Sequence, residues 1–127
     1  MRAKMIASGL VLAAILLICA HASRTIYSVS EGMRSLTLRA AAAARNGDRA
    51  GATEWIERLQ QNIDTNRTRL EVLAQHDDLN EICLLVIEAK VCLEGEEMQA
   101  FSHATAQILE LLTVLEEAQR LSVGNLL

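Results

Sequence analysis

Residues 52–73 read ATEWIERLQQNIDTNRTRLEVL. Seven positions in this stretch follow one another at alternate steps of four and three residues, and six of the seven are apolar. They are Ala52, Ile56, Leu59, Ile63, Asn66, Leu70 and Leu73. Steps of three and four place side chains on one face of an α-helix. The stretch therefore predicts an amphipathic helix that packs against other helices.

The same spacing occurs three more times in the chain. The further stripes are Ile26, Val29, Met33, Leu36, Ala40 and Ala43; Leu79, Ile82, Val86, Ala89 and Leu93; and Phe101, Ala104, Ile108, Leu111, Leu115 and Ala118. Four stripes of this kind suit an all-α fold in which residues 23–127 form an antiparallel four-helix bundle. The alternative is two helical hairpins in a repeat-like stack.

Turn residues lie between the stripes. Asn46-Gly47 favours a helix end, and Asp48 can cap the helix that follows. Gly95 favours the end of a later helix, and the two glutamates after it are expected to open the last one. The segment NGDRAGA, which begins at Asn46, aligns with EGEEMQA at an offset of 48 residues. The chain is therefore expected to contain a weak repeat of one helical hairpin.

The composition also favours helices, and it argues against nucleic-acid binding. The chain has 127 residues, no proline, and one residue each of Trp, Tyr and Phe. Without proline, long helices are not interrupted. A formal net charge of −4 and very few aromatic side chains do not suit a protein that binds nucleic acid.

Charge is unevenly divided along the chain. Residues 23–69 hold eight arginines and five acids, a net +3, whereas residues 70–127 hold two bases and eleven acids, a net −9. We expect the two halves to pair with each other inside one bundle. The alternative is a bipolar surface that meets a charged partner.

The N-terminal segment has the pattern of a membrane anchor. Arg2 and Lys4 precede MIASGLVLAAILLICA, residues 5–20, and the next charged residue is Arg24. A positive start and an apolar core are typical of a secretory leader. This core is long for a cleaved leader and close to the length that spans a bilayer. We therefore expect residues 1–22 to be retained as a signal anchor, with residues 5–22 in the lipid bilayer.

Two features of this leader bear on topology. The order of segments favours a single-pass protein of the cell membrane with its N-terminus inside and its domain outside, although arginines on both sides leave the positive-inside bias nearly balanced. Ala20-His21-Ala22 matches a leader-peptidase pattern. The alternative is therefore a secreted domain that begins at Ser23 after cleavage behind Ala22.

The cysteines are not expected to form a disulfide within the domain. Cys83 and Cys92 are nine residues apart on one predicted helix, which separates them by about 13 Å of rise. A disulfide needs Cα atoms within about 7 Å. We interpret both as small buried residues that neither pair nor bind a metal.

A few polar residues could do more than support the fold. His76, Asp77, Asp78 and Glu81 form the one cluster with metal-binding side chains, although a helix start with capping acids explains the same residues. In that explanation Asp77 or Asp78 is the N-cap and Glu81 stands at capping-box spacing from Asp78. We therefore predict no metal site and no cofactor.

Asn66 and Trp55 are the other candidates for interaction, together with His76. Asn66 falls on the seam of its helix, where a polar residue can set the register of helix pairing or open a polar pocket. Trp55 lies beside that seam and is expected to be half-buried, or else to anchor a partner. We find no nucleophile elbow and no glycine-rich phosphate loop, so we do not expect an enzyme.

The chain also resembles a known family. The apolar N-terminus, the Asn46-Gly47-Asp48 turn before Trp55, the segments HDDL at 76–79 and LEG at 93–95, and the ending LSVGNLL are similar to those of small bacterial proteins with an N-terminal membrane anchor. That family occurs mainly in Gram-positive lineages and is known only as a domain of unknown function. The resemblance implies an extracytoplasmic helical domain. We therefore expect a non-catalytic interaction module for a membrane or envelope protein, and as the alternative a helical bundle that binds a metal or ligand.

Overall fold

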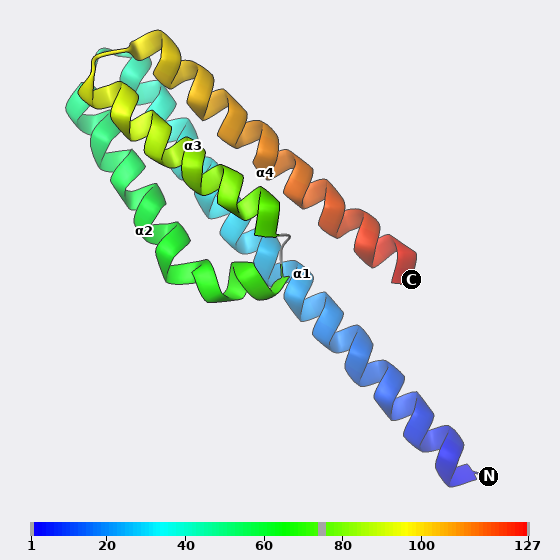
Figure 1. Cartoon of the computed structure of the whole chain (residues 1–127). Helices are drawn as coiled ribbons and strands as arrows, with labels where there is room; N and C mark the ends of the chain where they lie inside the picture. Colours follow the sequence, from blue (N-terminus) through cyan, green and yellow to red (C-terminus); the bar gives the residue numbers. More distant parts are fainter. Residues whose placement is uncertain (1, 74–75, 127) are drawn as a thin grey trace.

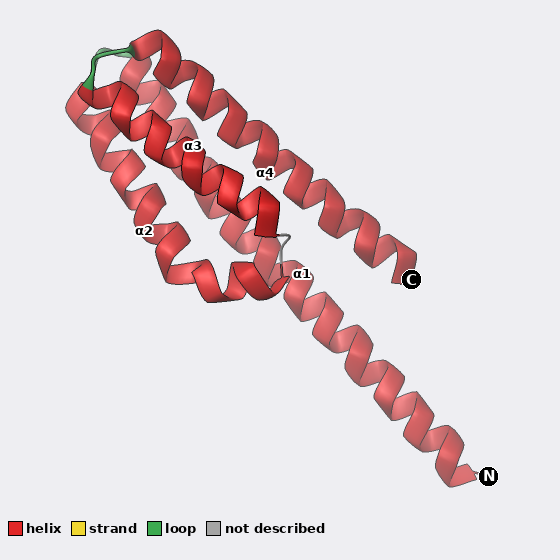
Figure 2. Ribbon diagram, viewed as in Figure 1, coloured by secondary structure: helices red, strands yellow, loops and turns green. Residues whose placement is uncertain are grey.

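The computed structural model describes the backbone of residues 2–73 and 76–126, and the side chains of these residues except 22, 23, 26, 72, 73, 76, 119 and 121–126. The described residues form four α-helices and no strand (Figures 1 and 2). The helices are α1 (Arg2–Arg45), α2 (Arg49–Leu73), α3 (His76–Glu94) and α4 (Met98–Leu126). The protein is therefore all-helical, as the heptad spacing predicted.

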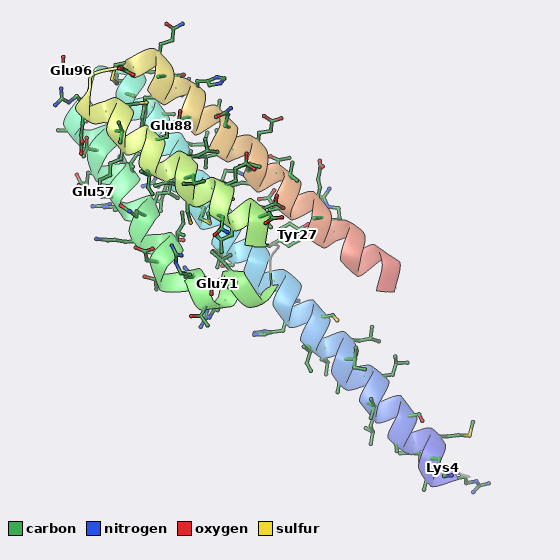
Figure 3. All side chains as sticks on the ribbon, in the orientation of Figure 1. Lys4, Tyr27, Glu57, Glu71, Glu88 and Glu96 are labelled. Carbon is green, nitrogen blue, oxygen red and sulfur yellow. The ribbon has the colours of Figure 1, made fainter. Side chains whose placement is uncertain are left out.

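The predicted anchor and the first predicted domain helix form one continuous helix. α1 has 44 residues and is unbroken at the expected domain boundary between residues 22 and 23. Its part from Arg2 to His21 has a mean hydropathy of 2.3 and none of it is buried. Figure 3 shows that no other helix lies beside the N-terminal end of α1 around Lys4. By length and composition alone, this part of α1 could cross a membrane.

The remainder of α1 and the other helices lie side by side. α1 contacts α2 and α4, and α3 contacts the same two helices. The 46–48 turn and the 95–97 turn lie together at one end, where Arg49 forms an ion pair with Glu96. The C-terminus and the exposed part of α1 lie toward the opposite end (Figure 1). The chain thus reverses direction after each helix.

The predicted stripes supply most of the core. Fully buried side chains come from all four helices and include Met33, Ile56, Leu59, Ile82, Phe101 and Ile108. Half-buried Val29 and Leu36 pack against these residues. Burial of each large aliphatic or aromatic side chain contributes about 1.5–3 kcal/mol. The apolar seams therefore hold the four helices together.

The buried face is wider than the predicted seams. Leu85, Cys92 and Leu112 are buried although they lie outside the stripes, whereas Ala118 of the fourth stripe is exposed. Each helix contacts two neighbours, so its buried face extends beyond two positions per heptad. Ser30, Thr37 and Thr105 are also buried.

These buried hydroxyl groups are all hydrogen-bonded. Thr37 Oγ1 donates to the Met33 carbonyl oxygen at 2.7 Å, and Ser30 Oγ donates to Glu116 Oε1 at 2.9 Å. A buried hydroxyl without a partner would cost about 1–3 kcal/mol. Among the described residues, no buried side-chain nitrogen or oxygen lacks a partner.

The first turn follows the predicted capping chemistry. The Asp48 amide donates to the Ala43 carbonyl at 2.8 Å, and the Gly47 amide donates to the Ala44 carbonyl at 3.1 Å. With Gly47 at a φ of 78°, this is a Schellman ending. The Gly51 amide donates to Asp48 Oδ1 at 2.9 Å. Asp48 is therefore the N-cap of α2, as predicted.

The second turn begins with Gly95, directly after the last residue of α3, as predicted, but α4 begins at Met98, after the two glutamates that were expected to open it. Its Schellman ending has the Glu97 amide donating to the Cys92 carbonyl at 2.9 Å and the Glu96 amide donating to the Leu93 carbonyl at 3.3 Å. The left-handed residue is Glu96, at a φ of 58°, and not the glycine before it. The two turns consequently correspond at an offset of 49 residues, so the predicted offset of 48 was wrong by one.

The basic and acidic halves of the chain do pair. Arg34 of α1 forms an ion pair with Glu116 of α4 at 3.0 Å, and Arg49 of α2 pairs with Glu96 before α4. The other ion pairs among the described residues lie within α2. This agrees with the expectation that opposite charges meet inside one helical assembly.

Candidate functional site

The cluster of residues with metal-binding side chains, for which no metal site was predicted, lies at the start of α3. Asp77 and Glu81 are exposed and Asp78 is half-buried, while the side chain of His76 lies outside the described residues. Among the residues that the structure describes, no three metal-binding side chains come together. α3 begins at His76, earlier than the predicted N-cap at Asp77 or Asp78. Both acids instead lie in the first helical turn, where they stabilise the helix dipole.

Trp55 helps to join α1 to α2. The Arg39 guanidinium carbon lies 4.9 Å from the centre of its ring, and that of Arg58 lies 4.8 Å from it. Trp55 is half-buried, as predicted, and packs against the core. Cation–π contacts of this kind contribute about 0.5–1 kcal/mol each at exposed sites. Since these arginines already occupy the ring, the contacts favour a structural role, and a partner-anchoring role stays a prediction.

Asn66 is half-buried and bonds within its own helix. Its Nδ2 atom donates to the Asn62 carbonyl at 2.8 Å, one helical turn earlier. This bond does not cross the seam to another helix. Asn66 also lines an open hollow between α1 and α2, together with His21 and Arg69. Its role in setting the register and its alternative role in a polar pocket both stay predictions.

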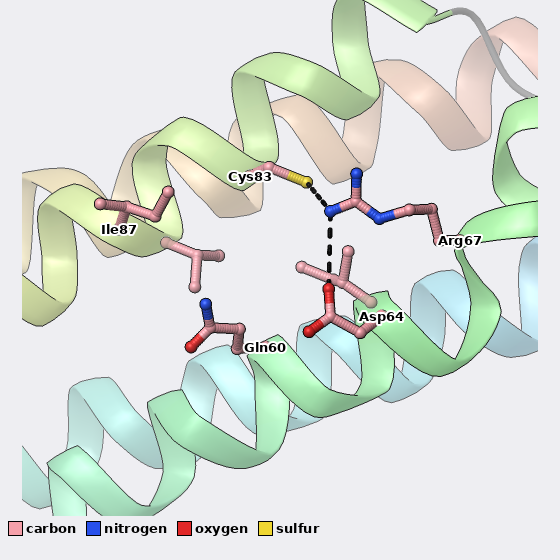
Figure 4. Close-up of a pocket in the computed structure, with 7 residues that line it drawn as sticks. Gln60, Asp64, Arg67, Cys83 and Ile87 are labelled. Carbon is pink, nitrogen blue, oxygen red and sulfur yellow. Dashed lines mark hydrogen bonds and ion pairs between the residues drawn. The ribbon is translucent and has the colours of Figure 1, made fainter.

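A small pocket separates α2 from α3 around Cys83 (Figure 4). Its volume is about 50 Å³. Arg67 Nη2 lies 3.9 Å from Cys83 Sγ and 3.5 Å from Asp64 Oδ1. Burial nevertheless raises the pKa of the Cys83 thiol above its usual value, in spite of the nearby Arg67. The protonated thiol is a poor nucleophile. This arrangement therefore does not favour catalysis.

The cysteines are unpaired, in agreement with the spacing argument. Cys19, Cys83 and Cys92 are all free thiols. Cys92 is buried as predicted, but Cys83 is only half-buried, which corrects the interpretation that both are core residues. Cys83 faces the α2–α3 pocket rather than the centre of the core.

The outer face of α3 carries an apolar stripe that lies outside the predicted seam. Leu84, Ile87 and Val91 are 66%, 51% and 60% exposed, respectively, and they follow one another at helical spacing. We call these three residues the α3 stripe. The sequence did contain a signal, because residues 82–87 read ICLLVI. A run without a polar residue makes a helix apolar on both faces, so one of them must meet solvent, lipid or a partner.

Comparisons with protein families, with curated proteins and with solved structures find no match for this chain. The resemblance to small anchored bacterial proteins therefore stays a prediction. Two features of the described residues are candidates for a functional surface: the exposed apolar half of α1 and the α3 stripe.

Proposed function

We propose that this protein is a membrane-anchored, non-catalytic interaction module. In this proposal, the N-terminal part of α1 crosses the cell membrane with its N-terminus inside. Residues 23–127 form an antiparallel four-helix bundle on the outer side, where α3 docks on a membrane or envelope protein. The contact between α1 and α4 supports a closed bundle, since an open stack of hairpins would not need it.

The α3 stripe is the observation that carries the docking proposal. Single exposed apolar residues are common on proteins, as Leu38 and Val114 illustrate here. Three consecutive residues of one helical stripe, each more than half exposed, are a different feature. Contiguous exposed apolar patches with a polar rim are typical of protein interaction sites. The α3 stripe therefore suits a partner that covers it with apolar side chains.

Charge indicates the chemistry of that partner. α3 holds five acids and one lysine, and that lysine is directed to α2, where its Nζ lies 3.2 Å from Gln60 Oε1. Glu81, Glu88 and Glu94 are exposed, and among the described residues none of them forms an ion pair. We infer an amphipathic partner helix with basic side chains beside its apolar face. A second copy of α3 would bring acids against acids.

Photo-crosslinking in native membranes tests this proposal. A photoreactive amino acid at 84, 87 or 91 should give one adduct, and mass spectrometry should place the crosslink in a basic amphipathic helix of another protein. The matched controls are probes at Leu38 and Val114, which are exposed and apolar but lie on α1 and α4. Equal adducts at the control positions, or only dimers of this chain, would contradict the proposal.

Serine substitutions in the α3 stripe provide a second test of the docking surface. Leu84→Ser, Ile87→Ser and Val91→Ser together should abolish the adduct formed by a probe placed at the adjacent exposed Glu88. Their effect on the free energy of unfolding should stay within about 0.5 kcal/mol per site, because the side chains are exposed. In the same membranes, the mass of the intact protein should include residues 1–22. A mature chain that begins at Ser23 would refute the anchor.

A further inference from the structure

An open hollow lies between α1 and α2 where the apolar part of α1 ends. It has a volume of about 470 Å³ and is open to solvent. Five residues of α1 and three of α2 line it. They include Arg24 and Ser28 from α1, and Asn62 and Arg69 from α2, but no aspartate or glutamate. The lining therefore offers donors and positive charge.

Five of the six other arginines in the basic half have a partner side chain, whereas Arg45, which lies outside the hollow, has none among the described residues. Arg34, Arg49, Arg58 and Arg67 each form an ion pair, and Arg39 stacks on Trp55. Among the described side chains, no carboxylate or aromatic ring pairs with Arg24 or Arg69. Two guanidinium groups without a protein counter-ion thus line one hollow. An anion of suitable size would neutralise both.

The neutral side chains add hydrogen-bond donors. Asn66 Nδ2 is used within α2, because it donates to the Asn62 carbonyl. The amide of Asn62 itself reaches toward α1, where its Nδ2 atom lies 3.7 Å from the place that a Cβ on Gly32 would occupy. An amide NH₂ carries two donor hydrogens, and a serine hydroxyl such as that of Ser28 carries one. Arginine forks and such donors together match the oxygen atoms of a phosphate group.

The position of the hollow suggests where the phosphate comes from. The candidate span from Arg2 to His21 has 20 residues, which corresponds to about 30 Å, the thickness of the hydrocarbon core. Arg24 lies three residues beyond His21, which corresponds to about 4.5 Å along the helix. The head-group layer occupies about 5–8 Å on each side of the hydrocarbon core. If α1 spans the membrane, Arg24 lies at the level of the lipid phosphates.

We propose that this hollow binds the phosphate group of an anionic phospholipid head group, with Arg24 and Arg69 as its counter-ions and Asn62 as an additional donor. The lipid as source rests on the proposed membrane anchoring, whereas the phosphate chemistry rests on the lining alone. The site lies between α1 and α2, away from the α3 stripe, so a lipid and a protein partner can bind together.

Native mass spectrometry of the full-length protein tests the proposal, with phosphatidylglycerol or phosphatidylcholine added to detergent micelles. The wild-type chain should retain one phosphatidylglycerol and little phosphatidylcholine. Arg24→Gln with Arg69→Gln should weaken this binding by about tenfold or more, since charge-assisted hydrogen bonds are lost. Arg45→Gln, at the opposite end of α1, is the control and should not change it.

A charge-preserving variant separates a built site from general attraction to anionic lipid. Arg24→Lys with Arg69→Lys retains both charges but loses the planar guanidinium forks, so it should bind phosphatidylglycerol more weakly than wild type. Asn62→Leu should also weaken binding without changing the charge. Unchanged binding in these variants would overturn the proposal. Each variant is first compared with wild type by thermal melting in phosphatidylcholine, and only folded variants are scored.

Inorganic phosphate decides between the two sources of the anion. Added at excess to the protein in phosphatidylcholine, it should raise the melting temperature less than phosphatidylglycerol does, and it should not displace the bound lipid. Equal stabilisation and displacement would assign the site to a free phosphate and overturn the lipid assignment. Loss of crosslinks at the α3 stripe would not affect these measurements, so the two proposals can fail separately.

Discussion

The two turns at the end opposite the exposed part of α1 share one hydrogen-bond pattern but differ in the residue at its left-handed position. Gly47 occupies that position in the first turn at a φ of 78°, and Glu96 occupies it in the second at 58°. A glycine adopts this conformation without steric cost, whereas an ordinary L-residue costs roughly 1–2 kcal/mol. Local preference therefore supports the first turn and opposes the second. Helix packing must supply the difference at Glu96.

The shared pattern also fixes which residues of the two hairpins correspond. Asp48 corresponds to Glu97, since their carbonyls accept the Ala52 and Phe101 amides at 3.0 Å and 2.9 Å. Ala52 therefore corresponds to Phe101, and both are fully buried. The hairpins repeat each other in backbone geometry but not in side-chain volume. A large aromatic ring is present at the start of α4 where α2 has a methyl group.

The largest expected effect on the free energy of unfolding comes from replacing Phe101 by alanine, the residue that α2 has at the corresponding position 52. Phe101→Ala should lower the free energy of unfolding by about 3–5 kcal/mol, because the buried ring is lost and a cavity remains. Gln107→Ala, at an exposed position of the same helix, should change it by less than about 0.5 kcal/mol. Urea unfolding of the full-length protein in detergent, followed by circular dichroism, measures both. A cost below about 1 kcal/mol for Phe101→Ala would show that its neighbours refill the space.

Much of the fold follows from sequence periodicity. Four apolar stripes predicted four helices, and Asn46-Gly47-Asp48 predicted a helix end followed by an N-cap, because glycine and aspartate have strong local preferences at those positions. The second turn did not follow in the same way. Gly95 correctly predicted where α3 ends, but the left-handed residue of the turn is Glu96. Local preference disfavours a left-handed glutamate, so the sequence around this turn does not predict that conformation.

The candidate sites were less predictable than the helices. Asn66 drew attention as a polar residue in a seam, but its nearness to Arg24 and His21 depends on how α1 passes α2. The α3 stripe was present in the run ICLLVI, yet the sequence alone does not say which of its side chains face outward. Convergence of residues far apart in the chain requires the helix arrangement, which spacing along one helix does not contain.

The second prediction compares the two turn glycines directly. Gly47→Ala should lower the free energy of unfolding by about 1–2 kcal/mol, since its left-handed φ is unfavourable for a residue with a Cβ. Gly95→Ala should cause no loss and can add about 0.4–1 kcal/mol, because that glycine is not left-handed and an added Cβ meets the Val91 carbonyl oxygen at an ordinary 3.5 Å. The same urea unfolding measures both. Equal losses would mean that the two positions have been distinguished wrongly.

The smallest expected effect is a gain in stability at Glu96. Glu96→Gly should raise the free energy of unfolding by about 0.5–1 kcal/mol, because glycine removes the steric cost of the left-handed conformation. The gain is smaller than that steric cost, since glycine loses more conformational entropy on folding than glutamate does. The substitution also removes the ion pair between Glu96 and Arg49. The side chain of Arg49 is 48% exposed and that of Glu96 is 74% exposed, so this ion pair contributes only about 0–1 kcal/mol. The comparison is therefore made in an Arg49→Ala background, where no ion pair is lost.

In that background, Glu96→Gln is the matched control, since it keeps a Cβ and loses only the charge. It should leave the free energy of unfolding unchanged to within about 0.5 kcal/mol. If Glu96→Gly stabilises the protein and Glu96→Gln does not, the cost at this turn lies in the backbone conformation. If both variants stabilise it equally, the cost lies instead in the negative charge next to Glu94 and Glu97. The two turns would then be equally relaxed in their backbones, and the contrast between Gly47 and Glu96 would be electrostatic rather than steric.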